Sequence, residues 1–475
     1  MWFNTYTFAA FLGIVFGAYW TLPPRGRQLF LLAASYVFYC WKTPVYGILL
    51  VVSTLLDYFC GLGLARTEHP AARRAILLCS ILGNLGLLLF FKYAHFLAAN
   101  VAGLGQWLGF ETNWKPFDFL LPAGISFYTF QTMSYTLEVY RRQIKTCRDP
   151  VAFALYVAYF PQLVAGPIER ADHLLPQLQK RQVFSWDNVV AGGGRILLGL
   201  FRKMVVADRL AILVDRVFAH VDDYSTATWW VALFAFAMQV YFDFAGYSDI
   251  AIGSARLFGV RLAENFRRPL MARSIADFWD RWHLTLTAWL RTNIFYPLGG
   301  SRRGRARTVL NIWVLFLLCG LWHGASWNFV IWGAYYALFN SLDYLWRQAR
   351  PRPKDETSAA APGLGGWVRI AATNALIALA ASLFRAKDLA ATGHVWGALL
   401  GRHGGAGLAT EWDVWALAAL MALIFWVEYL QEYRGLDDAF RRRPPWQKAI
   451  RLFLLAMALV FLSVSNQKPY VYFQF

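Results

Sequence analysis

His323 is the only histidine or charged residue in the apolar stretch of residues 315–333, LFLLCGLWHGASWNFVIWG. If Thr308 marks the cytoplasmic membrane edge and the segment is helical, fifteen residues at about 1.5 Å each place His323 roughly 22 Å deep. That depth lies past the middle of a hydrocarbon core about 30 Å thick. An ionisable group at such a depth is by default a functional-site hypothesis.

The chemistry open to His323 is proton transfer. A neutral buried imidazole can accept a proton from a hydroxyl, which makes His323 a candidate general base for attack by an alcohol. Small side chains nearby leave room for a close neighbour or a passing substrate, and flanking tryptophans could form apolar walls: Gly320, Gly324, Ala325, Ser326, Trp322 and Trp327. The alternative is that His323 bonds a carbonyl of an adjacent helix and only ties two helices together.

A second candidate, His283, lies in SIADFWDRWHLTLTAWLRTNIFYPLGG. At about 100° per residue, the apolar side holds His283 with Trp279, Trp282, Leu286, Trp289 and Leu290, and the other side holds Asp277, Asp280, Arg281, Thr287 and Arg291. The pattern predicts an amphipathic helix at the membrane surface or at the mouth of a cavity. His283 is then either a hydrogen-bonded packing residue or a second catalytic group. We list Trp279, Trp282, Arg291, Trp322 and Asn328 as further candidates for lining a tunnel or substrate path.

The amino-acid composition indicates that these residues lie in a membrane protein and not in a water-soluble one. The 475-residue chain is 58% hydrophobic and only 16% charged, below the roughly 25% charge of soluble domains. Apolar runs recur along the whole chain, and several reach the roughly 20 residues that cross a bilayer. We therefore expect an all-α polytopic membrane protein that forms one integral membrane domain over residues 1–475.

The net charge of +18 does not indicate a nucleic-acid partner. Its Lys and Arg residues stand in short clusters between apolar runs, the pattern of cytoplasmic loops beside anionic lipid headgroups. On this basis the N- and C-termini are expected on the extracytoplasmic side, with the long loop of residues 100–119 also outside. Residues 348–366 are expected to form a cytoplasmic loop.

The order of apolar runs gives candidate spans at residues 2–20, 28–41, 44–65, 75–98, 121–139, 151–165, 367–384, 414–429 and 449–464. Residues 309–345 are long enough for one very long helix or two crossings. The middle of the chain is broken by Gly, Pro and charge, and its charged residues should face protein, water or the interface: Arg202, Lys203, Asp208, Asp243 and Asp249.

Several reaction classes lack their motifs. The chain has no GxSxG elbow, no GxxxxGK[ST] loop, no GxGxxG and no clustered metal ligands, and its five cysteines contain no CxxC pair. These absences argue against a hydrolase-type triad, an ATP-driven pump, a Rossmann oxidoreductase and a metal site. Direct transfer to an acceptor hydroxyl, or transport, is left.

Long motifs carry a family resemblance. WDRWHLTLTAWLRTNIFYPLGG, followed by LLCGLWHGASWNFVIWGA, resembles the double signature of the membrane-bound O-acyltransferase (MBOAT) family. LPAGISFYTFQTMSYTLEVYR, YFPQLVAGPIERA, QVYFDFAGYSDIAIG and the terminal YVYFQF resemble its bacterial, alginate O-acetyltransferase-like branch. The resemblance implies roughly 11 to 13 membrane helices in a ring around a central funnel or tunnel, with amphipathic interfacial helices.

The resemblance also implies a reaction. His323 matches the family's intramembrane histidine and His283 the histidine of its RWH motif, so both are expected to be catalytic. An acyl group, acetyl from acetyl-CoA in this branch, would pass from the cytoplasm to a hydroxyl of an exported polysaccharide or of a periplasmic acetyltransferase partner. The basic residues 302–307 could attract coenzyme A phosphates or simply fix topology. The expected location is the bacterial inner membrane.

Two alternatives stay open at this point. The first is D-alanyl transfer from a loaded carrier protein to teichoic acid. The second is not enzymatic: a polysaccharide channel or flippase in which His323 gates or relays protons, although the sequence shows no repeat of the kind that many transporters carry.

Overall fold

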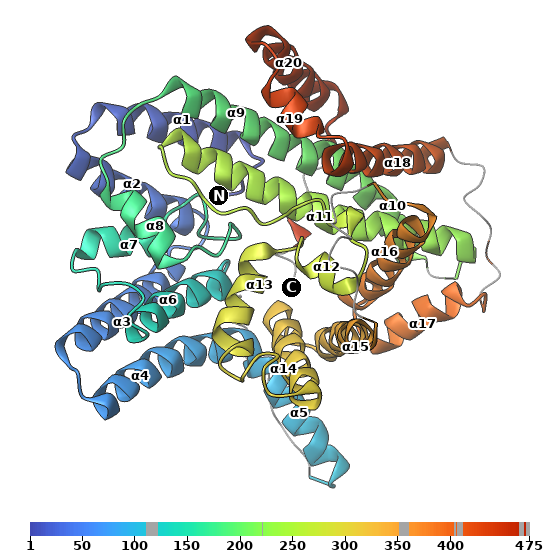
Figure 1. Ribbon diagram of the computed structural model, residues 1–475, viewed down its shortest axis with the longest axis horizontal. Helices are drawn as coiled ribbons and strands as arrows, with labels where there is room; N and C mark the ends of the chain where they lie inside the picture. Colours follow the sequence, from blue (N-terminus) through green and yellow to red (C-terminus); the bar gives the residue numbers. More distant parts are fainter. Residues whose placement is uncertain are drawn as a thin grey trace. The chain divides into compact units, whose positions relative to one another are not determined.

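The computed structural model of the chain describes residues 1–110, 122–220, 222–350, 361–402, 405, 412–464 and 470–471. Its elements are all helices in the part of the chain so described (Figure 1). The structure divides into two compact units, residues 1–196 with 247–263 and residues 197–246 with 264–475. The expected single domain stays a prediction.

The first unit contains the N-terminal helices. Their bounds are α1 Tyr6–Thr21, α2 Pro24–Cys40, α3 Tyr46–Arg66, α4 Pro70–Leu88, α5 Ala94–Trp107, α6 Ile125–Tyr140, α7 Pro150–Ala158, α8 Ala171–Gln179 and most of α9 Trp186–Leu200. A π-helical turn, Leu89–Tyr93, joins α4 to α5. α11, Thr226–Leu257, contributes its C-terminal end to this unit and its N-terminal part to the other.

The second unit contains the candidate site. Besides its part of α11, it holds α10 Asp208–Ala219, α12 Ile275–Trp279, α13 Leu284–Leu290, α14 Arg305–His323, α15 Trp327–Ala349, α16 Leu364–Arg385, α17 Leu389–Leu399, α18 Trp412–Tyr433, α19 Leu436–Arg441 and α20 Pro445–Leu462. π-helical turns cover Phe201–Ala207 and Arg291–Phe295.

Seven helical segments of the described residues are long and apolar enough to cross a membrane. They are Tyr46–Arg66, Pro70–Trp107, Thr226–Leu257, Arg305–His323, Leu364–Arg385, Trp415–Tyr433 and Pro445–Leu462. This bears out a multi-pass, all-helical membrane protein. The expected 11 to 13 spans, the ring and the tunnel stay predictions.

The structure corrects two expected boundaries in the first unit. The apolar run 151–165 is no full span, because α7 ends at Ala158, shortly before Pro161, which lacks the N–H that a continuing helix needs. The expected loop of residues 100–119 is helical at its start, since α5 continues to Trp107. Residues 111–119 of that loop, and 351–360 of the expected loop 348–366, lie outside the described residues.

The long apolar run 309–345 is two helices. α14 ends at His323 and α15 begins at Trp327, and Gly320 and Gly333 let their backbones approach closely. A Cβ on Gly320 would lie 2.2 Å from the Phe329 carbonyl oxygen, and one on Gly333 would lie 2.4 Å from the Phe316 carbonyl oxygen. Close small-residue packing of this kind is typical of membrane helix pairs.

Buried charges in the second unit face protein, as expected. Lys203 Nζ lies 2.6 Å from Asp243 and 2.9 Å from Asp208, and all three side chains are buried. The C-terminal segment joins this cluster, because the Val471 N–H donates to Asp243 at 2.8 Å and Lys203 lies over the Tyr470 ring. Opposite charges therefore compensate each other in the low-dielectric interior. Residues 472–475 of the terminal YVYFQF motif lie outside the described residues.

Candidate functional site

His323 lies at the C-terminal end of α14, where the helix stops abruptly. Gly324 has extended backbone angles and ends the helix, and its missing side chain matters because a Cβ there would lie 2.1 Å from the Phe329 ring. Ser326, also extended, begins α15. The small residues around His323 therefore admit a close neighbouring helix, one of the two roles expected for them.

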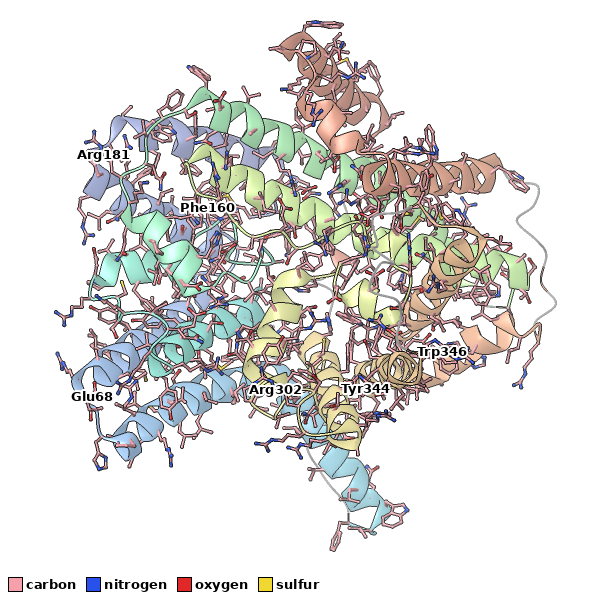
Figure 2. The ribbon with its side chains drawn as sticks, viewed as in Figure 1. Glu68, Phe160, Arg181, Arg302, Tyr344 and Trp346 are labelled. Carbon is pink, nitrogen blue, oxygen red and sulfur yellow. The ribbon has the colours of Figure 1, made fainter. Side chains whose placement is uncertain are left out.

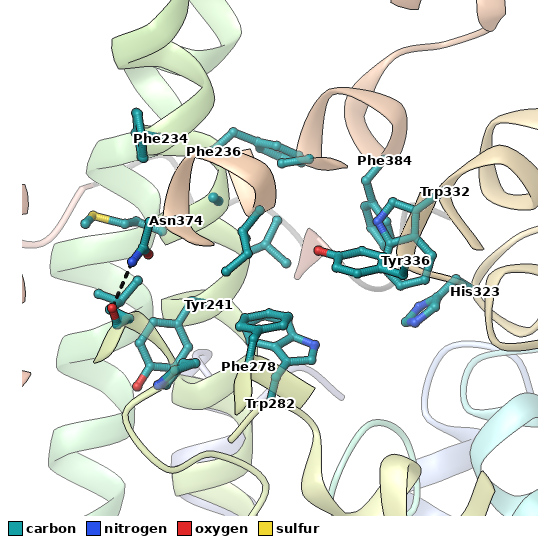
Figure 3. Close-up of a pocket in the computed structure, with 17 residues that line it drawn as sticks. Phe234, Phe236, Tyr241, Phe278, Trp282, His323, Trp332, Tyr336, Asn374 and Phe384 are labelled. Atoms are coloured by element: carbon teal, nitrogen blue, oxygen red, sulfur yellow. Dashed lines mark hydrogen bonds between the residues drawn. The ribbon is translucent and has the colours of Figure 1, made fainter. Parts of the chain in front are cut away.

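Aromatic rings surround the imidazole of His323. Its ring centroid is 4.8 Å from that of Trp332, 5.0 Å from Trp322 and 5.5 Å from Phe384, and His323 is only 6% exposed. His323 lines a narrow, largely apolar cavity of about 70 Å³ whose walls include Trp282 and Tyr336 (Figure 3). A titratable group in an aromatic cavity is the usual form of a small-molecule or catalytic site.

Seven aromatic residues of the cavity wall were not predicted from the sequence: Trp332, Tyr336, Phe384, Phe234, Phe236, Tyr241 and Phe278. The first two stand four residues apart on α15, and the buried face of that helix repeats at this spacing through Asn328, Trp332, Tyr336 and Asn340. That periodicity could have found the α15 residues. Phe384 comes from α16, and no local pattern connects it to His323.

The RWH segment is not one amphipathic helix, so that prediction is wrong. It forms two short helices, α12 and α13, separated by a turn that places His283 in the left-handed region at φ 44°. Two backbone hydrogen bonds to the preceding segment hold this turn. The Arg267 N–H donates to the Arg281 carbonyl at 2.9 Å, and the Leu284 N–H donates to the Asn265 carbonyl at 3.0 Å. Tertiary hydrogen bonds thus override the 3.6-residue periodicity.

Arg281 anchors this turn and is buried, although the helical pattern placed it on the polar side. Its guanidinium pairs with Asp277 at 2.8 Å and with Glu432 of α18 at 2.8 Å. A planar guanidinium that bridges two carboxylates holds a rigid geometry. Arg281 therefore positions the segment that carries Trp282 and His283.

The two histidines are linked through Trp322. The His283 ring lies 5.9 Å from Trp322 and 4.8 Å from Phe244, and Trp322 lies 5.0 Å from His323. His283 is fully buried but is not among the residues that line the cavity at His323. The arrangement suits a residue that orients Trp322 better than one that touches a substrate.

Acid should destabilise the protein through His283. Burial lowers the pKa of His283 to about 3, whereas an unfolded histidine takes up its proton near pH 6.5. The unfolded state therefore binds the extra proton between these values, and the free energy of unfolding should fall as the pH drops from about 6.5 towards 3, by on the order of 1 kcal/mol per pH unit. Unfolding in detergent between pH 7 and pH 4 measures the slope.

His283→Asn is the matched variant, because Asn also tolerates left-handed backbone. The slope should be flatter in His283→Asn than in the wild type. Equal slopes in the two proteins would assign the pH dependence to other groups.

A second cavity, of about 360 Å³, lies beside α14 on the side of its earlier turns. Its lining includes Trp279, Arg291, Cys319 and Tyr344 (Tyr344 is labelled in Figure 2). Cys319 stands one helical turn before His323. The basic residues Arg291 and Arg347 also line this second cavity. The Arg291 guanidinium pairs with the Asp280 carboxylate at 2.6 Å.

Trp279 forms part of the wall between the two cavities. Its indole lies 5.1 Å from Tyr336 and 5.9 Å from Trp332, which both line the cavity at His323. Trp279 itself and Phe316, 5.2 Å away, line the larger cavity. A few aromatic side chains therefore separate the larger cavity from His323.

Three expected wall residues, Trp322, Trp327 and Asn328, are not among the residues that line the two cavities. Asn328 is buried, but its amide donates to the Ala386 carbonyl at 2.8 Å and does not line the cavity. Trp327, at the first position of α15, is 53% exposed and lines neither of the two cavities. Asn328 instead ties α15 to the end of α16.

No group of three or more His, Cys, Asp or Glu side chains that could hold a metal occurs in the part of the chain that the structure describes. Polar side chains of the smaller cavity include His323, Tyr241, Tyr336 and Asn374. In the larger cavity Arg291 and Arg347 are each paired with a carboxylate, that of Asp280 at 2.6 Å and that of Asp343 at 2.9 Å.

Three known proteins that this chain is similar to are named for the transfer of an acyl group. The model of the MBOAT, membrane-bound O-acyltransferase, family matches residues 140–373, which include both histidines. The chain is 34% identical to the probable alginate O-acetylase AlgI of Pseudomonas putida over 98% of each chain. It is 32% identical to the peptidoglycan O-acetyltransferase of Helicobacter pylori over 85% of this chain and 80% of that one. The teichoic acid D-alanyltransferase of Bacillus subtilis is 25% identical over 48% of this chain and 60% of its own.

Proposed function

This chain belongs to the membrane-bound O-acyltransferase family and is an O-acyltransferase, and we propose that it moves an acetyl group from a cytoplasmic thioester to a hydroxyl of an exported cell-surface polysaccharide. A hydroxyl of a periplasmic partner acetyltransferase is the alternative acceptor. The observation that carries the proposal is the position of His323, a buried imidazole at a helix end that lines an aromatic cavity. The non-enzymatic channel or flippase is not retained for a member of this family.

His323 supplies the proton transfer. Its neutral imidazole accepts the proton of the acceptor hydroxyl while the hydroxyl oxygen bonds to the acyl carbon. The carbon–sulfur bond of the thioester breaks, and the thiolate leaves and takes the proton back from the imidazolium. Atoms and charge balance without a metal or redox cofactor in the step.

The larger cavity is suited to the donor. It reaches Cys319, one turn from His323, has a volume of about 360 Å³, and is lined by two arginines, Arg291 and Arg347, and one acidic residue, Asp343. The adjacent exposed Arg302, Arg303, Arg305 and Arg307 add positive charge (Arg302 is labelled in Figure 2). Acetyl-CoA, whose phosphates such charge attracts, is the donor that we propose.

The acceptor fits the smaller cavity less fully, since about 70 Å³ holds a reacting hydroxyl and not a sugar chain. Only the acceptor's reacting end would therefore reach His323. We propose that the transfer takes place across the bacterial inner membrane, with the extracytoplasmic termini that the charge pattern predicts. If a periplasmic acetyltransferase is the acceptor, it would pass the group on to the polymer.

The experiment is transfer of radiolabelled acetyl from acetyl-CoA by the full-length protein in inside-out vesicles, with polysaccharide or partner protein enclosed. Label in the enclosed acceptor supports the proposal. Label that appears only with a D-alanyl-loaded carrier would instead favour D-alanyl transfer, for which the Bacillus subtilis relative is the precedent.

Trp279→Ala should uncouple donor use from transfer. Removing the indole opens the wall between the cavities, so water gains access to the thioester near His323. We expect acceptor labelling to fall about tenfold, while hydrolysis of acetyl-CoA without acceptor rises. The measurement is the ratio of labelled acceptor to free acetate.

Trp346→Ala is the control, because Trp346 is 60% exposed on α15 and lines neither cavity. Its ratio should match the wild type. An unchanged ratio in Trp279→Ala would show that Trp279 does not separate donor from water.

A further inference from the structure

A basic pocket lies in the first unit, where α1 ends and α2 begins. It has a volume of about 360 Å³ and is lined by the four cationic residues Arg25, Arg27, Lys180 and Arg181, with Asp149 as the one acidic residue. Asp149 is already paired with Arg25. Arg27, Lys180 and Arg181 pair with no carboxylate among the described residues.

Arg27 is rigid and still carries its charge. Its guanidinium donates to the Leu22 carbonyl at 2.8 Å, the Gln182 carbonyl at 2.9 Å and the Trp20 carbonyl at 3.4 Å. It also stacks over the Trp20 ring at 4.8 Å. Carbonyl partners orient the group without neutralising it, so its positive charge acts on whatever enters the pocket.

The rim of the pocket is apolar and exposed. Directly after Arg181 and Gln182 come Val183, Phe184 and Trp186, which are 75%, 40% and 71% exposed. Phe184 packs against Trp20 at 5.3 Å, which joins this rim to the wall that Arg27 stacks on. Exposed Trp and Phe beside Lys and Arg are the side chains that proteins place at the lipid headgroup level.

We propose that this pocket binds a phosphate ester, and that its source is the headgroup of an anionic phospholipid whose acyl chains lie on the rim formed by Val183, Phe184 and Trp186. For the phosphate, the pocket supplies Arg27, which is held by hydrogen bonds, and the exposed Lys180 and Arg181. The rim supplies apolar surface that a soluble phosphate would not use. The site lies in the other unit from His323 and does not depend on the transfer reaction.

Lys180 and Arg181 are the residues to test, because both are exposed and neither side chain forms a hydrogen bond or ion pair with the part of the chain that the structure describes (Arg181 is labelled in Figure 2). Full-length protein in uncharged detergent is titrated with short-chain phosphatidylglycerol, and binding is followed by tryptophan fluorescence. The double variant Lys180→Gln/Arg181→Gln should weaken binding roughly 10- to 30-fold, since each basic residue near an anionic lipid contributes about a factor of five.

The matched control is Arg66→Gln/Arg74→Gln, which makes the same charge change at two exposed residues elsewhere in the first unit. It should alter binding less than twofold. Equal weakening in both doubles, or none in Lys180→Gln/Arg181→Gln, would overturn the site. Glycerol 3-phosphate and coenzyme A serve as soluble probes: equally tight binding of either, lost in the same double variant, would keep the phosphate site but overturn the lipid as its source.

Discussion

His323→Ala should reduce acetyl transfer at least 100-fold while the protein stays inserted at normal abundance. General acid–base catalysis contributes about 10² to 10⁴-fold, and among the described residues His323 is the only histidine that lines the cavity. The measurement is acceptor labelling in vesicles normalised to the amount of membrane-inserted protein. Because the imidazole lies among Trp322, Trp332 and Phe384, its removal leaves a gap between these rings.

His283→Ala separates the two histidines. His283 contacts Trp322 and does not line the cavity, so its loss should lower transfer less than the loss of His323. If both variants lost acetyl transfer equally, His283 would be as important for the reaction as His323. Near wild-type labelling in His323→Ala would refute the general-base assignment outright.

The sequence predicted His323 as a site residue from two observations: the chain is a membrane protein, and His323 lies deep within one of its apolar segments. His323 is conspicuous because a membrane interior makes an ionisable group costly, and that argument needs no coordinates. The same argument predicted that Lys203, Asp208 and Asp243 face protein, water or the interface and not lipid, and the structure places them against one another inside the protein. The cost of an ionisable group in a membrane interior therefore predicts the surroundings of individual residues from the sequence alone.

Periodicity failed where tertiary bonds decide the backbone. The segment around His283 has a good helical pattern, yet hydrogen bonds from Arg267 and to Asn265 hold a left-handed turn at its centre. Those partners lie about 15 to 20 residues away in sequence, outside any local window. Long-range contacts likewise bring Phe384 to His323.

The break between α14 and α15 was left undecided for a related reason. The 37 residues from 309 to 345 are mostly apolar and carry no charged residue before Asp343, so the length of the run fits one helix or two. The decision rests on the fit of Phe329 against Gly324 and of Gly320 against Gly333. Steric fit between two segments is not encoded in the average polarity of either.

Gly320→Ala tests that fit, and its expected effect is nearly as large as the loss of His323. In an open helix the change would stabilise by about 1 kcal/mol through helix propensity. Here the new Cβ would lie 2.2 Å from the Phe329 carbonyl oxygen, so α14 and α15 must separate by about 1 Å, with an overpacking cost of roughly 1 to 3 kcal/mol. We expect lower thermal stability and a loss of transfer of about 100-fold, because a displacement of that size at a reacting group has such a cost.

Gly393→Ala provides the comparison for Gly320→Ala in the same unit. Gly393 is exposed within α17 and has no atom within 4 Å of an added Cβ, so its replacement should keep wild-type transfer and raise stability slightly. Both variants replace a helical glycine with alanine. They differ in the atoms that the new methyl group contacts. If Gly320→Ala retained wild-type labelling and melting temperature, the close approach of α14 and α15 would not be what holds His323 against Trp332. If only Gly320→Ala loses both, backbone proximity between the two helices sets the geometry at the imidazole.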